Sequence, residues 1–256
     1  MTTDVTEPPE LLWHYTGFAA FNSIVTSREL WATHHAFMND RKEFTDGLQI
    51  IEDYAIKTDH GSLGGVVRAQ VTSPAFVACF SKNPDQLGLW SLYGEAGGVA
   101  LGFRREVLLN RVRNFSPNGN PNELATELSE VIYSEERFRS TVAQVFRPNA
   151  SVHDYRAMHL AASYKRRDWE TEEEWRATVL MYMSTVETWC YRSTKLGLVP
   201  FVKIPLGAAS EFAQVLAKVR VGPSPYNDER CQSVNLRLES AGLGLVEVDA
   251  SGVEYR

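Results

Sequence analysis

The sequence predicts an α+β fold. Strand-like and helix-like segments follow one another without the regular alternation of βαβ units, and no internal repeat is present. The chain has 256 residues, of which 44% are hydrophobic and 23% are charged, so it is long enough and apolar enough to close a large core. We therefore expect a single folded domain over residues 11–256, preceded by a flexible polar tail over residues 1–10.

Runs of bulky and aromatic residues predict strands in the N-terminal part of the chain. These runs are Leu11 to Thr16, Glu29 to His34, Ala75 to Ser81 and Val99 to Phe103. Between them, apolar residues recur at helical spacing. They predict helices carrying the sets Phe18, Phe21, Ile24 and Val25; Phe44, Leu48, Ile51 and Tyr54; and Leu87, Trp90 and Tyr93.

The C-terminal part begins with a stretch of two prolines and four asparagines, Asn114 to Asn122, which predicts a long surface loop. A mostly helical region is expected from about Glu135 to Arg167, and a last helix from Glu229 to Ser240. Further strands are expected at Val131 to Tyr133, between Glu172 and Tyr182, and at Val199 to Ile204, Ala217 to Val221 and Leu245 to Val248.

Charge and cysteine content limit the class of protein. The net charge of −6 argues against a surface that coats phosphates, so any contact with nucleic acid must be local. Cys79, Cys190 and Cys231 are odd in number and form no C-x-x-C spacing, so we expect reduced thiols. Neither a signal peptide nor a run of roughly 20 apolar residues is present, which predicts a cytoplasmic protein.

Several polar residues have two interpretations each. His14, on a predicted strand between two aromatic residues, either fills a core or presents a ring nitrogen to a ligand. The polar turn residues Asn39, Asp40 and Glu43 either cap the following helix, which is the better default, or bind the hydroxyls of a ligand. Ser81 lacks a surrounding G-x-S-x-G sequence, which argues against serine-hydrolase chemistry.

The densest group of charges runs from Lys165 to Arg176 and continues into an apolar strand. Alternation along a strand would place Glu172, Glu174 and Arg176 on one face and Trp175 on the other. Two carboxylates beside a guanidinium can hold a ligand or stabilise developing positive charge, and they can equally form a structural ion network. The residues themselves leave both interpretations open.

A series of short motifs runs along the whole chain. The motifs are W-H-Y-T at Trp13, L-W-A-T at Leu30, M-N-D-x-x-E-F at Met38, C-F-S at Cys79, L-W-S-L-Y-G at Leu89, G-V-A-L-G-F at Gly98, E-x-E-W-R at Glu172, V-G-P at Val221 and the ending S-G-V-E-Y-R. This series resembles a prokaryotic domain-of-unknown-function family, over about residues 11 to 256.

A more distant resemblance rests on the order of the expected elements. They are strand-borne His14, the helix ending at Ile24 and Val25, the strand end Phe80-Ser81, the helix with Trp90 and Tyr93, the strand from Val99 to Phe103, and strand-borne Glu174. This order is similar to that of H-Y-E-type ADP-ribosyltransferases, including DarT-like toxins that modify nucleic acid. The resemblance implies the ADP-ribosyltransferase fold, with a mixed, mostly antiparallel sheet and helical insertions.

The same resemblance implies NAD as a substrate and no metal. Glu174 would be the catalytic carboxylate beside the reacting ribose, and His14 would hydrogen-bond the other ribose. Tyr93 completes the implied catalytic set. The implied NAD-binding residues are His14, Tyr15, Thr16, Asn39, Asp40, Phe80, Ser81, Trp90, Glu172 and Arg176.

Two roles within that set have more than one candidate. Phe80 stands where the family has a tyrosine that stacks on nicotinamide, and Tyr93 or Tyr15 are the alternatives. Arg176 or Arg167 would meet the pyrophosphate, for which a planar guanidinium is suited.

The leading hypothesis is therefore an NAD-dependent ADP-ribosyltransferase that modifies RNA, DNA or protein in a toxin or phage-defence role. The alternatives are a non-catalytic nucleotide-binding or regulatory module and an NAD glycohydrolase. An antitoxin or other regulatory partner is expected, and a membrane is not. If the leading hypothesis holds, His14 and Glu174 line one cleft.

Overall fold

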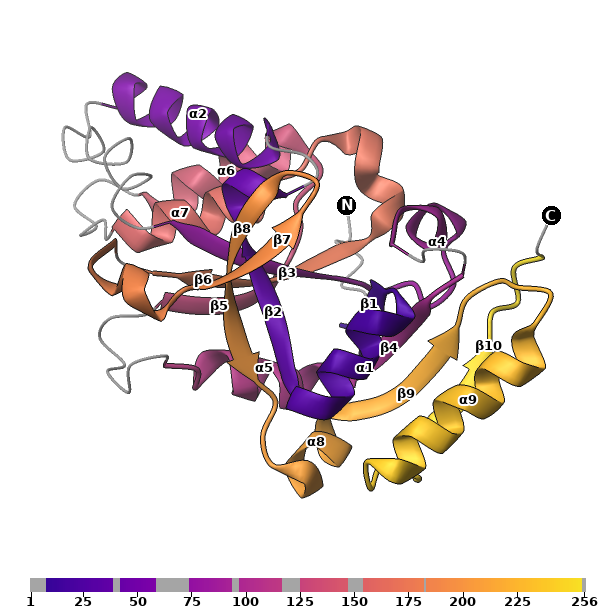
Figure 1. Ribbon diagram of the computed structural model, residues 1–256. Helices are drawn as coiled ribbons and strands as arrows, with labels where there is room; N and C mark the ends of the chain where they lie inside the picture. Colours follow the sequence, from indigo (N-terminus) through magenta and orange to yellow (C-terminus); the bar gives the residue numbers. More distant parts are fainter. Residues whose placement is uncertain are drawn as a thin grey trace. The chain divides into compact units, whose positions relative to one another are not determined.

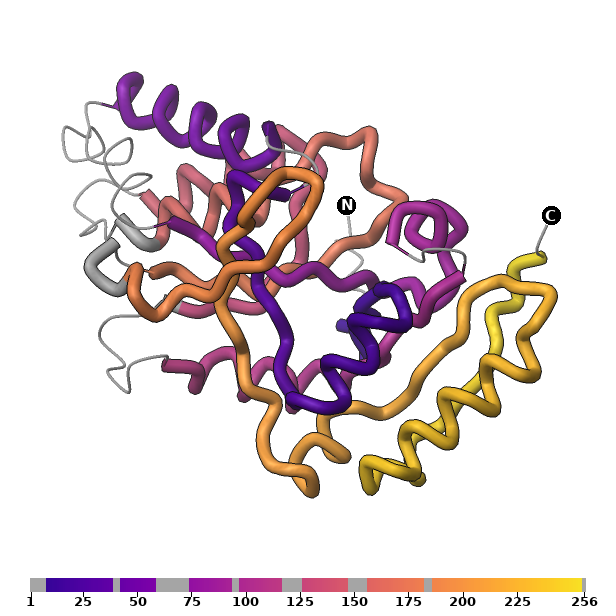
Figure 2. Tube along the Cα trace, viewed as in Figure 1, coloured from indigo at the N-terminus to yellow at the C-terminus, as the bar shows by residue number. Residues whose placement is uncertain are grey.

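The computed structural model describes residues 8–38, 42–58, 74–93, 97–116, 125–146, 154–181 and 183–254, whose path is traced in Figure 2. The chain divides into two compact units. The first unit contains Met1–Glu29, Phe80–Asn110 and Leu206–Arg256, and the second unit contains Leu30–Cys79 and Arg111–Pro205. The single domain expected over residues 11–256 stays a prediction.

The first unit is a mostly antiparallel sheet with strand order β10-β9-β4-β1 (Figure 1). Its elements are β1 (Leu11–Thr16), α1 (Phe18–Ser27), α4 (Leu87–Tyr93), β4 (Val99–Arg104), α8 (Ala209–Val215), β9 (Leu216–Val221), α9 (Asn227–Ser240) and β10 (Glu247–Ala250). Only β10 pairs in parallel, with β9, among the strand pairs of this unit that the structure describes. Helix α9 packs along β9 and β10.

The second unit has the strand order β7-β8-β2-β3-β6-β5. Its elements are β2 (Glu29–His34), η1 (His35–Phe37), α2 (Lys42–Lys57), β3 (Ala75–Ser81), β5 (Ala125–Glu130), α6 (Glu135–Val145), α7 (Asp154–Ala162), η4 (Arg167–Glu172), β6 (Glu174–Leu180), η5 (Met183–Thr188), β7 (Cys190–Thr194) and β8 (Gly197–Pro205). The unit boundary falls inside β2 and β3, and α5 (Arg105–Arg113) also begins in one unit and ends in the other.

The core of the second unit is apolar and lies between helices. Phe44, Leu48 and Ile51 of α2 join Phe138 of α6 and Met158 of α7 in one buried cluster, and α2 packs against both other helices. The helical face predicted from the spacing of Phe44, Leu48 and Ile51 is thus the buried face. No helix in the described ranges is long and apolar enough to cross a membrane.

The predicted α+β class is confirmed, with an open and mostly antiparallel sheet. Strands β1, β2 and β3 have the predicted bounds, and the other apolar strands lie within two residues of theirs. Burial explains why these strands were predicted correctly, because runs such as Ala75–Ser81 have few polar residues and are buried almost throughout.

The helices α5 and α8, the strands β5 and β7 and the short 3-10 helices η1, η4 and η5 were not predicted. The strand expected at Val131 to Tyr133 is wrong: only Ile132 forms an isolated bridge, to Tyr164, and the strand is the preceding β5. In β5 the polar residues outnumber the apolar ones, and among the side chains whose burial is described, Thr126 to Glu130, Leu128 is the one that reaches the core. Such a strand is specified by its partner β6 rather than by its own pattern.

Gly222 lies directly after strand β9 in the first unit, where two backbone segments approach closely. Its N–H donates to the carbonyl oxygen of Gly98 at 3.1 Å. A Cβ atom on Gly222 would lie 1.5 Å from the carbonyl oxygen of Gly97 and 2.8 Å from Cε3 of Trp90. The V-G-P motif therefore has a packing explanation, because no side chain fits between these backbones.

We expect Gly222→Ala to destabilise the protein by more than about 3 kcal/mol, since the Gly97 backbone would have to move. Gly244→Ala is the matched control, because its Cβ would meet its nearest atom, in Glu239, at an ordinary 3.5 Å. Urea unfolding of both variants measures the difference. Equal stability of the two variants would contradict the packing described for Gly222.

Candidate active site

Five charged side chains gather in the interior of the second unit. Each is at most 8% exposed, and they come from α2, the segment after α7, η4 and β6. They are Glu43, Lys165, Glu172, Glu174 and Arg176. Three carboxylates face two cations, and we call this group the buried charge cluster.

The backbone at Glu173 brings both glutamates of the E-x-E-W-R motif to the cluster. Glu172 ends the 3-10 helix η4, and Glu173 follows in the left-handed region with φ 44°. Strand β6 begins only at Glu174. Placing Glu172 on the strand was therefore wrong, whereas the prediction that Glu174 and Arg176 share a face is confirmed by their hydrogen bonds.

Arg176 uses every nitrogen of its guanidinium inside the fold. Nε donates to Oε1 of Glu174 and Nη2 to Oε2, both at 2.9 Å. Nη2 also donates to Glu43, and Nη1 donates to the carbonyl oxygen of Ala162 at 2.8 Å. This two-pronged pairing is the geometry in which a guanidinium holds a carboxylate most firmly.

Lys165 holds the three carboxylates together. Its Nζ lies 2.7 Å from Oε2 of Glu172, 3.0 Å from Oε2 of Glu174 and 3.1 Å from Oε1 of Glu43. The ammonium donates hydrogen bonds to Glu172 and Glu174, and it pairs with Glu43 by charge alone. In the sequence, Lys165 comes shortly after the apolar residues of helix α7, which are buried. This apolar setting is the sequence feature that indicates a buried lysine.

The electrostatic balance differs between the carboxylates. Burial alone would raise the pKa of Glu174, but the adjacent Arg176 and Lys165 lower it to about 2. For Glu43 burial prevails over the same cations, and its pKa is raised. The pKa values of Arg176 and Lys165 are raised, because burial opposes the charge of each but the surrounding carboxylates, Glu174 foremost, outweigh it. Glu174 is thus an ionised carboxylate throughout the physiological range.

Two further groups fix Glu174 in place. The hydroxyl of Tyr133 accepts a hydrogen bond from the backbone N–H of Glu174 at 2.7 Å. The thiol of Cys79 on β3 is hydrogen-bonded to the Glu174 carboxylate, and burial together with that negative charge raises the pKa of the thiol. Cys79 is therefore a neutral donor rather than a thiolate nucleophile.

The remaining predicted site residues that the structure describes lie in the first unit. Trp90 and Tyr15 are buried and meet edge to face, with ring centroids 4.6 Å apart, and Tyr93 packs against the same cluster. The Tyr15 hydroxyl accepts from the Gln86 N–H at 3.0 Å and donates to the carbonyl oxygen of Asn83 at 2.7 Å. These aromatic groups form a small core under α4.

His14, Thr16, Phe80 and Ser81 lie on adjacent strands of the first unit. The rings of His14 and Phe80 are tilted, with centroids 5.7 Å apart, and His14 is half-buried. Ser81 is buried, and its Oγ accepts a hydrogen bond from the Asn83 N–H at 3.0 Å. Thr16 is half-buried at the end of β1, opposite Val99.

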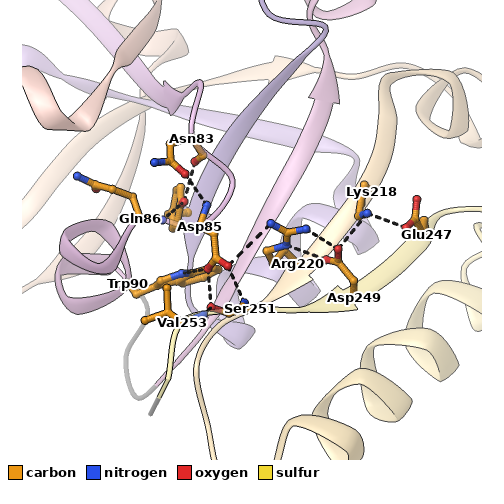
Figure 3. Close-up of polar contacts among 12 residues, drawn as sticks. Asn83, Asp85, Gln86, Trp90, Lys218, Arg220, Glu247, Asp249, Ser251 and Val253 are labelled. Atoms are coloured by element: carbon orange, nitrogen blue, oxygen red, sulfur yellow. Dashed lines mark hydrogen bonds and ion pairs between the residues drawn. The ribbon is translucent and has the colours of Figure 1, made fainter. Parts of the chain in front are cut away.

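Asp85 is a second centre of polar contacts in the first unit, shown in Figure 3. Its Oδ1 accepts from Nε1 of Trp90 at 2.8 Å and from the Ser251 hydroxyl at 2.5 Å, and its Oδ2 accepts from the Gly252 N–H at 2.6 Å. Asp85 thereby ties α4 to the C-terminal motif S-G-V. Sequence reasoning missed Asp85, which bears no periodic or spacing signal.

Figure 3 also shows ion pairs between β9 and β10. Arg220 pairs with Asp249 through two hydrogen bonds, and Lys218 lies 2.6 Å from Glu247 and 2.9 Å from Asp249. The signal for this ladder is in the sequence, since cations alternate in β9 where anions alternate in β10.

Asn39 and Asp40 lie outside the described residues. The other predicted site residues fall into two sets: Glu172, Glu174 and Arg176 in the second unit, and His14, Tyr15, Thr16, Phe80, Ser81, Trp90 and Tyr93 in the first. Each set is compact within its unit. The expectation that His14 and Glu174 line one cleft stays a prediction.

Comparison with known families bears on the segment that contains Glu174. Residues 89–177 match the model of a family described as a protein of unknown function (DUF2971). The match includes the L-W-S-L-Y-G and E-x-E-W-R motifs, and so Glu172, Glu174 and Arg176 of the buried charge cluster. It supports the predicted membership of a domain-of-unknown-function family. No curated protein and no solved structure matches the chain.

We expect Arg176→Met to destabilise the second unit by about 3–5 kcal/mol, because it leaves Glu174 and Glu43 buried with one cation fewer. Arg167→Met is the matched control: its side chain is 86% exposed, so the change should be close to neutral. Denaturant unfolding measures both. An Arg176→Met protein as stable as the control would show that the cluster does not hold the unit together.

Proposed function

We propose that the protein is an NAD-dependent ADP-ribosyltransferase that modifies a macromolecule, with Glu174 as its catalytic carboxylate. The observation that carries the proposal is the geometry of Glu174, a buried carboxylate that Arg176 holds through two hydrogen bonds of 2.9 Å, so that it stays ionised in the interior. Breaking the bond between ribose C1′ and nicotinamide builds positive charge on the ribose. A fixed anion in a water-poor setting stabilises that charge more than it stabilises NAD itself.

The reaction balances without a further reactant. Nicotinamide leaves with the electron pair of the glycosidic bond, and a nucleophile of the acceptor forms the new bond to C1′ and loses its proton. If water replaces the acceptor, the same step makes free ADP-ribose, which is the glycohydrolase alternative. Glu174 would act on the ribose in both reactions.

Lys165 contacts the Glu174 oxygen that this proposal assigns to the ribose. When Lys165 gives up its contact with Oε2 of Glu174, it keeps its partners Glu172 and Glu43. A ribose hydroxyl can then donate to the vacated lone pair, while Arg176 still holds the carboxylate. The exchange costs little in charge balance, because all members of the cluster remain paired.

A specific observation favours a second candidate, a non-catalytic nucleotide-binding or regulatory module. Glu174 is only 4% exposed, and both of its carboxylate oxygens accept hydrogen bonds from cations. A cluster paired this fully also meets the requirements of a purely structural ion network. The two functions differ in whether NAD is consumed.

The decisive experiment incubates the protein with labelled NAD and a cell extract. We expect label on one class of macromolecule, and Glu174→Gln should lower the rate about 10²–10³-fold by removing the anion beside the ribose. Glu43→Gln is the matched control, because Glu43 also pairs with Arg176 and Lys165 but has no role on the ribose. It should alter stability and leave most of the activity.

Three outcomes of this experiment lead to different conclusions. Equal losses in the Glu174→Gln and Glu43→Gln proteins would assign the effect to folding and remove Glu174 as a catalytic residue. Consumption of NAD without labelling would favour the glycohydrolase. Intact NAD after long incubation with folded wild-type protein, extract and RNA would contradict both enzymatic functions and leave the binding module.

A further inference from the structure

Arg192 on β7 is a half-buried cation without a carboxylate partner among the described residues. Its Nη2 donates to Oγ1 of Thr33 at 2.9 Å. Its Nε is buried and has no hydrogen-bond partner within the described ranges. Burial lowers the pKa of Arg192, and no acidic side chain in the described part of the chain counteracts that effect. In a chain with an excess of acidic residues, this unmatched guanidinium stands apart from Arg176.

The strand register places Arg192 beside a pair of aromatic rings. Arg192 lies opposite Val199 in the β7–β8 hairpin, and Cys190 lies opposite Phe201. Residues paired in this way share a face of the sheet. On that face Phe201 stacks on Trp31 of β2, with centroids 4.3 Å apart and an interplanar angle of 27°.

Residues of β2 and β3 connect this face of the sheet to Glu174. Thr33, two residues after Trp31, receives the Arg192 hydrogen bond and lies opposite Val77 of β3. Cys79 is two residues after Val77 and is hydrogen-bonded to Glu174. Alternation along strands therefore puts Arg192, the Trp31–Phe201 pair and Glu174 on one face of the second unit's sheet.

The groups on this face match the parts of a phosphorylated nucleotide. An unpaired Nε beside an Nη is the edge with which a guanidinium binds two oxygens of a phosphate. The Thr33 hydroxyl adds a polar group, and the half-buried Trp31 gives a flat apolar surface on which a planar ring can stack. Arg176 is unsuited to a phosphate, since its nitrogens already donate to Glu174, Glu43 and Ala162.

We propose that Arg192 and Thr33, beside the Trp31–Phe201 pair, form a phosphate-binding subsite for a nucleotide. The identification of that nucleotide as NAD, bound through its pyrophosphate, rests on the proposed function. Binding would complete the hydrogen bonding of Arg192 and neutralise its charge. Glu174 lies further along the same sheet face, where the reacting end of the nucleotide would be.

Calorimetric titration with ADP, and with adenosine as the phosphate-free arm, tests the subsite. We expect ADP to bind at least tenfold more tightly than adenosine, and Arg192→Gln to remove that advantage. Thr33→Val should weaken ADP binding by a smaller factor. Lys195→Gln is the matched control, since Lys195 is an exposed cation in the turn of the same hairpin, and it should leave binding unchanged.

A structural role for Arg192 predicts a different result from a binding role. A half-buried cation that has no carboxylate partner among the described residues adds little to the stability of the fold, so the unfolding temperature of Arg192→Gln should be at least that of the wild type. A lower unfolding temperature together with unchanged ADP affinity would assign Arg192 to the fold and overturn the proposal. Absence of ADP binding to the wild type would overturn it as well.

The outcome also separates this inference from the proposed function. ADP binding that needs Arg192, in a protein that leaves NAD intact, supports the subsite and contradicts the transferase. NAD consumption whose KM is the same in the wild-type and Arg192→Gln proteins supports the transferase and overturns the subsite.

Discussion

The pairing of Arg176 with Glu174 is the constraint on which the second unit depends. Removing two charges from water costs free energy. This cost is offset only because the guanidinium of Arg176 and the carboxylate of Glu174 are well hydrogen-bonded in the interior. Glu43 from α2 and Lys165 from the segment after α7 complete the arrangement. The buried charge cluster thus joins helix α2 to a loop and a strand that lie far from it in the sequence and close to each other. It also keeps one carboxylate ionised in an apolar interior, which is the property that the proposed chemistry needs.

The parts of the fold that follow from local pattern were predictable, and those that follow from distant partners were not. Buried apolar runs such as Ala75–Ser81 can be recognised as strands from their own residues. Polar strand β5 does not, because β6 supplies its pairing. The E-x-E-W-R motif indicated Glu174 and Arg176 together, but nothing in its spacing indicates that Glu43, 133 residues before Arg176, would share the guanidinium. Arg192 escaped notice because a single arginine in a hairpin carries no sequence signal, and only its contacts in the structure show that it has no carboxylate partner among the described residues.

The short motifs separate into structural and candidate functional sets once their contacts are known. Gly222 of V-G-P is required by the close approach of Gly97, and the C-terminal Ser251 and Gly252 bind Asp85. Trp90 of L-W-S-L-Y-G donates to the same aspartate. These contacts explain three motifs by the packing of the first unit. The E-x-E-W-R motif differs, because it concentrates charge in an interior where apolar residues would pack at lower cost.

Titration of the Glu174 carboxyl carbon by NMR, with Glu174→Gln used to assign the signal, tests the central claim most directly. A carboxylate with a lowered pKa stabilises the fold at pH values above its usual pKa of 4.5. This stabilisation is lost as the pH falls from 4.5 toward about 2. We expect the midpoint of the Glu174 titration at about pH 2, or a signal that keeps its ionised position to the pH at which the protein unfolds. A midpoint at or above 4.5 in the folded protein would contradict the account.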